Sequence, residues 1–467
     1  MTGDRPRHTV VVDLGYGDAG KGAVVDRLCR SDGVDTVVRF NGGAQAGHNV
    51  VTRDGRQHTF AQFGSGTFVP GVRTHLSRFM LVDPLALAAE AAHLRTLGVR
   101  DAFARLTVDR RALLTTPYHA AANRHREAAR GTARHGSCGL GVGETARYAL
   151  AHPRSAPTAG DCAAPARLLT VLTRLRERLT DELGLGAPLG PPPEDCATAF
   201  RAFAEQVALA DENHLAAALR RGPVVLEGAQ GVLLDEWHGF HPYTTWSTTT
   251  FGNAGTLLAE AGAAPGSALR LGVLRTYTVR HGPGPLVTEN PALGRALPEP
   301  HNGHGRWQGA FRRGDFDAVA HRYALAVCAR SAFGAVQALA LTHLDAPARH
   351  PYLSICETYD LDGDEIHDLP TGPPGDLRRQ AALTTRLLRA RPGRTHTPGP
   401  DPHSWAEVVA DTLDTPVLLR SHGPRAVDRL PQDGPGTRRV RGIAGVNGVH
   451  RISGVRDIRD SPMSLLA

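Results

Sequence analysis

A single lysine ends a glycine-rich loop near the start of the chain. Of the 53 lysines and arginines, only Lys21 is a lysine, and the segment Gly15–Lys21 fits the pattern G-x-x-x-x-G-K. Apolar runs at Val10–Val12 and Ala23–Val25 predict a buried strand before the loop and a helix after it. Backbone N–H groups of such a turn bind anions, and an ammonium enters a phosphate-lined crevice more easily than a planar guanidinium. The loop is therefore predicted to bind the phosphates of a nucleotide.

Two residues of this segment differ from an ordinary phosphate-binding loop. Gly22 stands where a Ser or Thr hydroxyl usually holds Mg²⁺. Asp18 lies inside the loop, where a carboxylate is unfavourable beside phosphates unless it binds a metal ion or handles a proton. We therefore expect Asp18 to supply the missing oxygen ligand. The alternative is a glycine-rich turn without a ligand.

A second glycine-rich loop follows the next predicted strand. The strand Thr36–Phe40 leads into Asn41–Asn49, which contains His48. A loop histidine is more often a surface residue than a catalyst. The carboxyl ends of parallel strands, however, meet at one edge of a sheet, so Asp18 and His48 are expected side by side. A carboxylate base and an imidazole acid suit phosphoryl transfer coupled to proton transfer.

Strand-like and helical runs alternate along the rest of the chain. Helical periodicity is clearest at Pro84–Thr96 and Phe316–Arg330. The alternation predicts an α/β fold with a P-loop-NTPase-like, mostly parallel central sheet, helices on both faces and smaller subdomains. The predicted strands are Val10–Leu14, Thr36–Phe40, Arg78–Val82, Leu106–Asp109, Pro223–Glu227, Arg270–Tyr277, Gln337–Thr342, Tyr352–Tyr359 and Thr415–Leu419.

Composition argues against several other classes of protein. The 467 residues contain no apolar run of about 18 residues and no signal-peptide pattern at the start, which predicts a cytoplasmic protein without a membrane span. The six cysteines have no zinc-site spacing and are expected to be free thiols. The net charge of +7 comes from dispersed arginines, without the aromatic-interleaved basic strip that single-stranded nucleic acid needs. A positive charge also suits phosphorylated small ligands.

With these motifs the chain resembles the adenylosuccinate synthetase family. The two glycine loops are followed, in the family's order, by further matching segments. These are Glu227–Asp235, His241–Tyr243, Thr248–Thr250, Tyr277 with Arg280 and Gly282–Pro285, Thr288–Glu289, Leu341–Asp345 and Ser421–Pro424. The resemblance spans roughly residues 8–429. It implies one α/β domain over residues 1–429. Residues 430–467 are rich in Gly, Arg and Asp and poor in periodic pattern, which predicts an irregular C-terminal extension.

The resemblance implies a GTP-dependent C–N ligase that uses Mg²⁺. In the family, an aspartate removes the N1 proton of a 6-oxopurine nucleotide such as IMP, and the oxo group attacks the γ-phosphate of GTP. The amine of aspartate then displaces the phosphate. Carried over to this sequence, Asp18 is the base, His48 the acid, Lys21 neutralises phosphates and Gln230 contacts the oxo group. Asp18 and the carbonyl of Gly47 would hold the metal ion.

The resemblance also implies which residues bind GTP, the acceptor and the amine. Asp345 lies where the family recognises guanine, since a carboxylate can accept the N1 and N2 protons of that base. The expected GTP-binding residues are Gly17, Asp18, Ala19, Gly20, Lys21, Gly22, Ala23, Gly47, His48, Asn49, Arg312, His343, Leu344, Asp345, Ser421, His422 and Gly423. The expected acceptor- and amine-binding residues are Gln45, Ala46, Ser137, Cys138, Gln230, Thr250, Arg306 and Ala310. A homodimer that acts on small molecules is the family expectation.

The departures from the family fall on the acceptor and the amine. Leu140 replaces an arginine in the loop that holds the nucleotide 5′-phosphate, and Glu144 replaces a proline. In the loop that grips the carboxylates of aspartate, here Arg306–Arg313, only Arg312 aligns with an arginine, and Ala310 replaces another. Loss of an arginine removes charge-assisted hydrogen bonds to carboxylate or phosphate.

Two interpretations of these departures stay open. One is an adenylosuccinate synthetase whose substrate contacts have drifted. The other is a specialised relative in secondary metabolism that phosphorylates a different oxo or lactam acceptor and adds a different amine. The two are close, and retention of the phosphoryl-transfer and GTP residues slightly favours the second. A non-catalytic GTP-binding protein is disfavoured, because it would not need Asp18 and His48 together.

Overall fold

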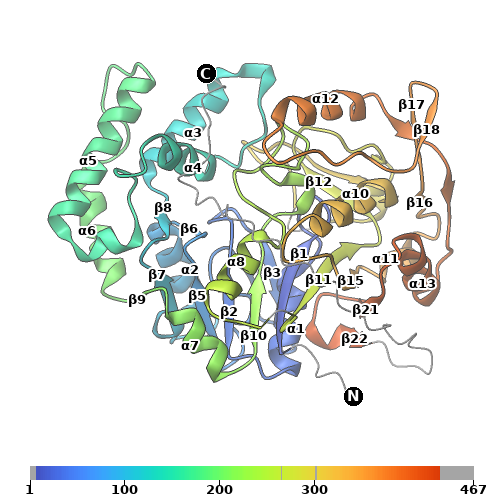
Figure 1. The fold of residues 1–467 in the computed structure, drawn as a ribbon, viewed down its shortest axis with the longest axis horizontal. Helices are drawn as coiled ribbons and strands as arrows, with labels where there is room; N and C mark the ends of the chain where they lie inside the picture. The colour runs from blue at the N-terminus through green and yellow to red at the C-terminus, as the bar shows by residue number, and fades with distance from the viewer. Residues whose placement is uncertain (1–6, 265, 300–301, 432–467) are drawn as a thin grey trace.

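The core of the fold is a ten-stranded sheet (Figure 1). The computed structural model describes residues 7–264, 266–299 and 302–431. The strand order is β22-β21-β15-β11-β1-β10-β2-β5-β7-β9, and every pair is parallel except β21 and β22. The strands are β1 (His8–Asp13), β2 (Thr36–Arg39), β5 (Arg73–Leu76), β7 (Leu106–Asp109), β9 (Ala208–Ala210), β10 (Val224–Glu227), β11 (Ala268–Arg275), β15 (Ala338–Thr342), β21 (Val417–Ser421) and β22 (Arg429–Pro431). The predicted fold class is confirmed.

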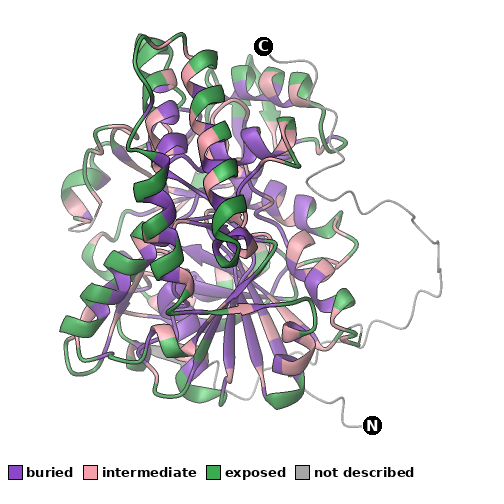
Figure 2. Cartoon of the chain, turned by 90° about the vertical axis from the view of Figure 1, so that its left-hand side faces the viewer, coloured by how far each residue is buried: buried purple, intermediate pink, exposed green. Residues whose placement is uncertain are grey.

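Helices cover both faces of this sheet, as predicted. Val10 and Val12 pack into one apolar core and Val11 into another, because side chains alternate between the faces of a strand. The core around Val11 contains apolar residues of α1 (Lys21–Ser31). The core around Val10 contains residues of α7 (His214–Arg221), α8 (Gly252–Glu260), α10 (Ala318–Ala329), α12 (Leu377–Leu387) and α13 (Pro402–Thr412). Figure 2 shows the buried strands between helices whose outer faces are exposed.

A third core lies at the β9 end of the sheet. It joins β5 and β7 to α2 (Pro84–Thr96), α3 (Pro117–Ala129), α5 (Pro165–Glu182) and α6 (Pro193–Ala204). The predicted bounds of α2 are confirmed, and its start has a local cause. The Asp83 side chain accepts hydrogen bonds from the N–H groups of Leu85 and Ala86, and Pro84 occupies the first helical position, where a missing N–H costs nothing.

Small sheets and short helices surround the central sheet. Three small sheets have two strands each: β3 (His48–Val51) with β4 (Gln57–Phe60), β6 (Leu81–Val82) with β8 (Leu113–Leu114), and β12 (Thr278–His281) with β13 (Phe311–Gly314). Two have three strands each. In one, β16 (Ile355–Cys356) lies between β14 (Phe316–Asp317) and β20 (Thr395–His396), and in the other, β17 (Tyr359–Leu361) lies between β18 (Asp364–Ile366) and β19 (Arg391–Pro392). The remaining α-helices of the described ranges are α4 (Val142–Ala151), α9 (Leu293–Ala296) and α11 (Ala346–Arg349).

Two predicted central strands are wrong. The central strand β5 is Arg73–Leu76, whereas the predicted run Arg78–Val82 contributes only β6 to a small sheet. Met80 and Val82 are buried, so their apolar character reflects packing of a connection and not a position in the main ladder. The run Tyr352–Tyr359 likewise contributes only β16 and the first residue of β17.

Three further predictions concern the C-terminal residues, the cysteines and membrane-spanning helices. The predicted irregular extension begins instead with β22, which pairs with β21, and residues 432–467 lie outside the described residues. All six cysteines are free, as predicted. Within the described ranges, no helix combines the length and the apolar character needed to cross a membrane.

Candidate active site

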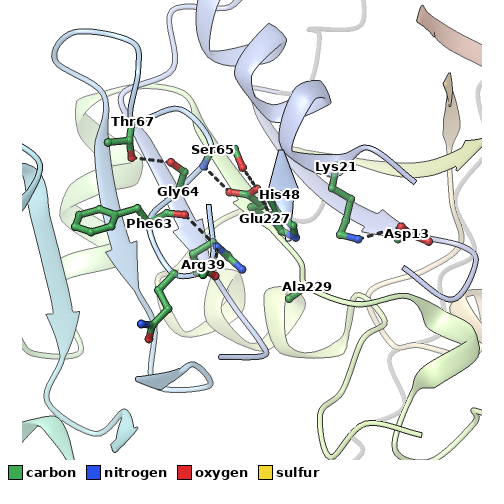
Figure 3. A network of polar contacts seen from close by, with 12 residues as sticks. Asp13, Lys21, Arg39, His48, Phe63, Gly64, Ser65, Thr67, Glu227 and Ala229 are labelled. Atoms are coloured by element: carbon green, nitrogen blue, oxygen red, sulfur yellow. Dashed lines mark hydrogen bonds and ion pairs between the residues drawn. The ribbon is translucent and has the colours of Figure 1, made fainter. Parts of the chain in front are cut away.

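Asp13, the last residue of β1, organises the glycine loop. Its carboxylate accepts hydrogen bonds of 2.9 Å from the N–H groups of Gly15 and Ala19. The same carboxylate lies 3.0 Å from Nζ of Lys21 (Figure 3). Nζ also donates to the carbonyl oxygen of Gln230 at 2.7 Å. Both charged side chains are buried. Asp13 was not among the predicted site residues, although a carboxylate at the end of an apolar strand is a usable signal.

The predicted phosphate-binding residues form one continuous turn. Gly17, Asp18, Ala19 and Gly20 make the loop, and Lys21, Gly22 and Ala23 open α1. Gly20 caps the helix in the left-handed conformation, and Asp18 also has a positive φ of 58°, which is uncommon for a residue other than glycine. The N–H groups of the first helical turn therefore point out of the end that the loop surrounds.

The structure explains why Gly22 replaces the usual Ser or Thr. A Cβ atom at this position would lie 2.8 Å from both Cβ and the carbonyl carbon of His48. The start of β3 therefore contacts the first turn of α1 directly, and only a glycine allows that approach. His48 therefore lies beside the helix that follows the first glycine loop, and its position beside Asp18 stays a prediction.

A third loop, which follows β10, completes this edge of the sheet. A Cβ atom at Gly231 would lie 2.2 Å from the carbonyl oxygen of Gly15, so the loop after β10 packs against the phosphate loop. Asn41, in the loop after β2, forms hydrogen bonds with the loop after β10. Its side-chain amide donates to the carbonyl of Ala229 at 3.0 Å and accepts from the N–H of that residue at 2.7 Å. Strands β1, β10 and β2 are neighbours, so their carboxyl ends bring the three loops together.

His48 is held by a buried carboxylate on the adjacent strand. Its Nδ1 lies 2.6 Å from Oε1 of Glu227, the last residue of β10 (Figure 3). Ser65 fixes that carboxylate from the other side, through its hydroxyl and through its N–H at 2.9 Å. Burial lowers the pKa of His48 to about 4, against the opposing pull of Glu227. Burial raises the pKa of Glu227, but His48, Arg39 and Ser65 together outweigh that effect and bring it to about 2.

These shifts define the state of the histidine. Glu227 is ionised at neutral pH and accepts a hydrogen bond from Nδ1 of His48. Nε2 of the neutral ring then carries a lone pair, and this atom is buried without a hydrogen-bond partner among the described residues. Within those residues, the side-chain amides of Gln45 and Gln230 are also buried without partners. Unpaired buried polar groups cost about 1–3 kcal/mol each, so three of them in adjoining loops mark a ligand-binding site.

Asp18 has the properties of a metal ligand or a base. None of the described residues donates a hydrogen bond to its half-buried carboxylate, whereas Nε of Arg275 donates to its backbone carbonyl at 2.6 Å. Burial raises the pKa of Asp18, and Arg275, His281 and Lys21 oppose the rise. Gly47 on the next loop is exposed, and the role of its carbonyl as a second oxygen ligand stays a prediction.

Few protein ligands surround this candidate metal position. The described residues contain no group of three or more His, Cys, Asp or Glu that could hold a metal ion. Mg²⁺ usually binds through one or two carboxylates together with substrate phosphates and water, so Asp18 in a phosphate loop fits that cation.

The predicted guanine-binding segments lie side by side at the ends of β15 and β21. The N–H of Leu344 donates to the carbonyl of Ser421 at 2.9 Å, and the hydroxyl of Thr342 donates to the carbonyl of Ala19 at 2.8 Å. The second bond connects this region to the phosphate loop. Asp345 is partly exposed and pairs with Arg349 at 2.8 Å. Guanine recognition by His343, Leu344, Asp345, Ser421, His422 and Gly423 stays a prediction.

The predicted acceptor and amine residues belong to loops that touch one another. A Cβ atom at Gly136 would lie 2.4 Å from Pro283, and one at Gly139 would lie 2.8 Å from the ring of Trp307. The N–H of Gly282 donates to the carbonyl of Ala310 at 2.9 Å. Three segments therefore meet, and they contain Ser137, Cys138, Arg306 and Ala310. Ala46 and Thr250 are buried on the loop after β2 and just before α8.

Two residues singled out in the sequence have structural partners. Arg312 lies in β13, pairs with Glu289 at 2.6 Å and donates to the carbonyls of Gly282 and Gly284 at 3.0 and 2.8 Å. Its guanidinium is thus bound by protein groups, and the predicted contact of Arg312 with GTP would require breaking these interactions. Glu144 pairs with arginines of α3 and α4 at 3.1 and 2.9 Å, which accounts for this acid without reference to a substrate.

Fold and site together define a nucleotide-binding phosphoryl-transfer enzyme on a parallel α/β sheet. The model of the protein family described as "Adenylosuccinate synthetase" matches residues 10–384 of this chain. The adenylosuccinate synthetase of Chlorobium luteolum is 35% identical over 431 residues, with 89% of this chain and 95% of that protein covered. That of Chlorobium limicola is 33% identical over 432 residues, with the same coverage. The chain belongs to the adenylosuccinate synthetase family, whose members are GTP-dependent C–N ligases that use Mg²⁺.

Solved structures show the same fold at lower identity. The fully ligated adenylosuccinate synthetase of Plasmodium falciparum matches with a TM-score of 0.77 and 20% identity, covering 91% of this chain and 100% of that one. The succinoaminodeoxyadenylate synthetase of cyanophage S-2L, bound to dGMP and dATP, matches with a TM-score of 0.57 and 18% identity, covering 92% and 96%.

Proposed function

We propose that this chain uses GTP to phosphorylate the oxo group of a 6-oxopurine nucleotide or a close analogue, and that an amine then displaces the phosphate. The observation that carries the proposal is the pair of His48 and Glu227. It places a histidine whose Nε2 is buried and unpaired among the described residues beside the first turn of the phosphate-loop helix, which the Cβ and backbone of His48 contact. A protein that only bound GTP would have no use for a buried, carboxylate-supported imidazole at this position.

The residues divide the chemistry between them. A lactam oxygen is a poor nucleophile until its ring proton leaves, and the half-buried carboxylate of Asp18 takes that proton. Mg²⁺, held by Asp18 and the Gly47 carbonyl, would neutralise charge on the phosphates of GTP. The ammonium of Lys21 donates to Asp13 and to the carbonyl of Gln230, and these two hydrogen bonds hold its positive charge beside the phosphate loop. The unpaired amide of Gln230 orients the oxo group.

His48 assists the departure of the leaving group, GDP, in the phosphoryl transfer. A phosphate oxygen at Nε2 favours the protonated ring, and the ionised Glu227 at Nδ1 stabilises the same form. The imidazolium then donates to the bridging oxygen between the β- and γ-phosphates as negative charge develops there. That interaction is stronger in the transition state than in the ground state, which is the condition for catalysis.

The test is GTP-dependent phosphate release with IMP and aspartate, followed by other acceptors and amines. Phosphate release that requires both an acceptor and an amine is the expected result. Positional isotope exchange in oxygen-labelled GTP, with the acceptor but without the amine, reports the phosphoryl step alone. An absence of both signals across IMP, dGMP and other oxopurine nucleotides would refute the proposal.

A second candidate is the specialised relative with a different acceptor and amine. It is favoured by the aromatic wall of the acceptor region, where Trp307 faces the Gly139 loop and lies 5.9 and 5.3 Å from the guanidinium carbons of Arg134 and Arg306. Leu140 in the same loop offers no charge to a 5′-phosphate. Turnover with inosine that equals turnover with IMP would support this candidate, whereas a strict need for the 5′-phosphate would exclude it.

We also propose a cytoplasmic homodimer, from the family's usual assembly and from the absence of a membrane-spanning helix in the described ranges. Sedimentation of the full chain at micromolar concentration measures its mass, and a monomer under turnover conditions would contradict the assembly.

A further inference from the structure

His281 has a buried ring nitrogen that the chemistry described above does not use. It is the last residue of β12, and its Nδ1 lies 3.1 Å from Oε1 of Gln308. Its other nitrogen, Nε2, is buried without a hydrogen-bond partner among the described residues. An amide oxygen can only accept a hydrogen bond, so the ring carries its hydrogen on Nδ1 and presents a lone pair at Nε2.

The strand that carries His281 runs beside the phosphate loop. Strand β12 follows β11, whose last residue, Arg275, donates to the carbonyl of Asp18. Arg280 stacks over the ring of Tyr16, with its guanidinium carbon 4.3 Å from the ring centre. In its protonated form, His281 is also among the groups that oppose the rise in the pKa of Asp18. His281 therefore ends the strand that leads from the Arg275–Asp18 contact to the loop of Gly282.

The same ring lies where the acceptor and amine loops converge. Cβ atoms at Gly282 and Gly136 would lie 2.5 and 3.4 Å from the carbonyl oxygen of Gln308. Gln308 belongs to the segment that replaces the family's aspartate-binding loop, so it connects that segment to the ring of His281. The edge of the ring packs against Phe311, with centres 4.8 Å apart, which restricts its orientation.

We propose that His281 accepts a hydrogen bond, and then a proton, from the amine that attacks the phosphorylated carbon, with Gln308 holding the ring in the required tautomer. This inference rests on the proposed function. A neutral amine that forms a bond to carbon with its lone pair carries one surplus proton. As that N–C bond forms, the C–O bond breaks, its electron pair leaves with the phosphate, and the surplus proton moves to Nε2. The resulting imidazolium is stabilised by the Gln308 oxygen at Nδ1.

The test separates the two steps of the reaction in the full-length protein. His281→Phe keeps the packing against Phe311 but removes the acceptor atom. Positional isotope exchange in labelled GTP with IMP, without an amine, is expected to stay within about 3-fold of the parent protein. Phosphate release that depends on aspartate is expected to fall by about 10²-fold, the usual scale for a general base. His367→Phe, at an exposed position outside these loops, is the control and should change neither rate.

Gln308 provides a readout that simple loss of packing would not reproduce. Gln308→Leu removes the partner of Nδ1 and should lower amine-dependent turnover by about 10-fold, while Gln308→Glu keeps an acceptor and should lower it less. Equal turnover of His281→Phe and the parent would overturn the inference, as would an equal loss of exchange and turnover. Exchange in the unmodified protein establishes the proposed function separately, and its absence would overturn both.

Discussion

Two strand-terminal carboxylates each hold a functional side chain of another segment. Asp13 at the end of β1 binds Lys21, and Glu227 at the end of the neighbouring β10 binds His48. Each acid is almost completely buried, so its charge is unscreened and fixes its partner in one orientation. The cation and the imidazole are thus positioned before any nucleotide arrives, which lowers the cost of organising the site.

Asp18 and His48 should fail in different ways when substituted. Asp18→Ala removes both the base and a metal ligand, so we expect it to weaken Mg²⁺–GTP binding and to lower turnover together. His48→Asn should keep GTP binding within a few-fold but lower kcat by roughly 10²–10⁴-fold, the usual scale for a general acid. Calorimetry and positional isotope exchange measure the two effects. Parental exchange by His48→Asn would remove His48 from the phosphoryl step.

Lys21 should not be replaceable by arginine. Its ammonium lies 3.0 Å from Asp13 and 2.7 Å from a carbonyl oxygen in a buried position, and the wider planar guanidinium of arginine would crowd both. We expect Lys21→Arg to keep the parental circular dichroism spectrum and to lose about 10²-fold in turnover. Arg30→Lys at the other end of α1 is the control. Near-normal activity of Lys21→Arg would contradict the geometric argument.

At the scale of elements, the site depends on how closely α1 approaches the His48 loop. Gly22→Ser would introduce the residue of an ordinary phosphate loop, yet its Cβ would clash with His48 at 2.8 Å. We expect a loss of about 1–3 kcal/mol in the free energy of unfolding and reduced turnover, because overpacking displaces the loop. Gly186→Ser, where no atom lies within 4 Å, should change neither. Urea unfolding measures the effect, and a Gly22→Ser protein with higher activity would contradict it.

The neighbouring ends of β15 and β21 form the element on which nucleotide choice depends. Asp345 can accept two guanine N–H donors but would face the bare N1 acceptor of adenine. Asp345→Asn should reduce the preference for GTP over ATP by about 10²-fold, if a charge-assisted pair is lost. Competition binding measures the ratio. A parent protein that binds both nucleotides equally would contradict the assignment of this segment to guanine.

At the scale of the whole molecule, buried histidines make stability depend on pH. Burial lowers the pKa of His75 and His119 to about 3 and that of His321 to about 4, from a usual value of 6.5. The unfolded chain therefore binds more protons than the folded one between about pH 4 and 6.5. The stabilisation is fully present above pH 6.5 and is lost as the pH falls through this window.

Urea unfolding at a series of pH values tests this dependence. The midpoint should fall steadily from pH 7 to pH 4.5, and His119→Gln should flatten the slope. His367→Gln, at an exposed position, should leave the slope unchanged. A midpoint that is constant over this range in the parent protein would contradict the effect of the buried histidines.

The sequence by itself determined the features that local pattern controls. The phosphate loop, the bounds of α2 and the parallel sheet follow from glycine spacing, an N-cap with proline, and apolar runs between helical segments. The residues expected at the carboxyl edge gather there because parallel strands all end on the same side. The strand β5 was missed because Arg73–Leu76 carries polar residues, while the apolar run Arg78–Val82 packs elsewhere.

The pairing of functional side chains depends on long-range packing and could not be predicted from local pattern. Glu227 and His48 are 179 residues apart in the chain, and no local pattern links a strand-terminal acid to a loop histidine. The reason for Gly22 likewise appears only when a second loop packs against α1, and the engagement of Arg312 with Glu289 only when β12 and β13 pair. Such contacts depend on how the strands are ordered in the sheet, and that order results from the packing of the whole core.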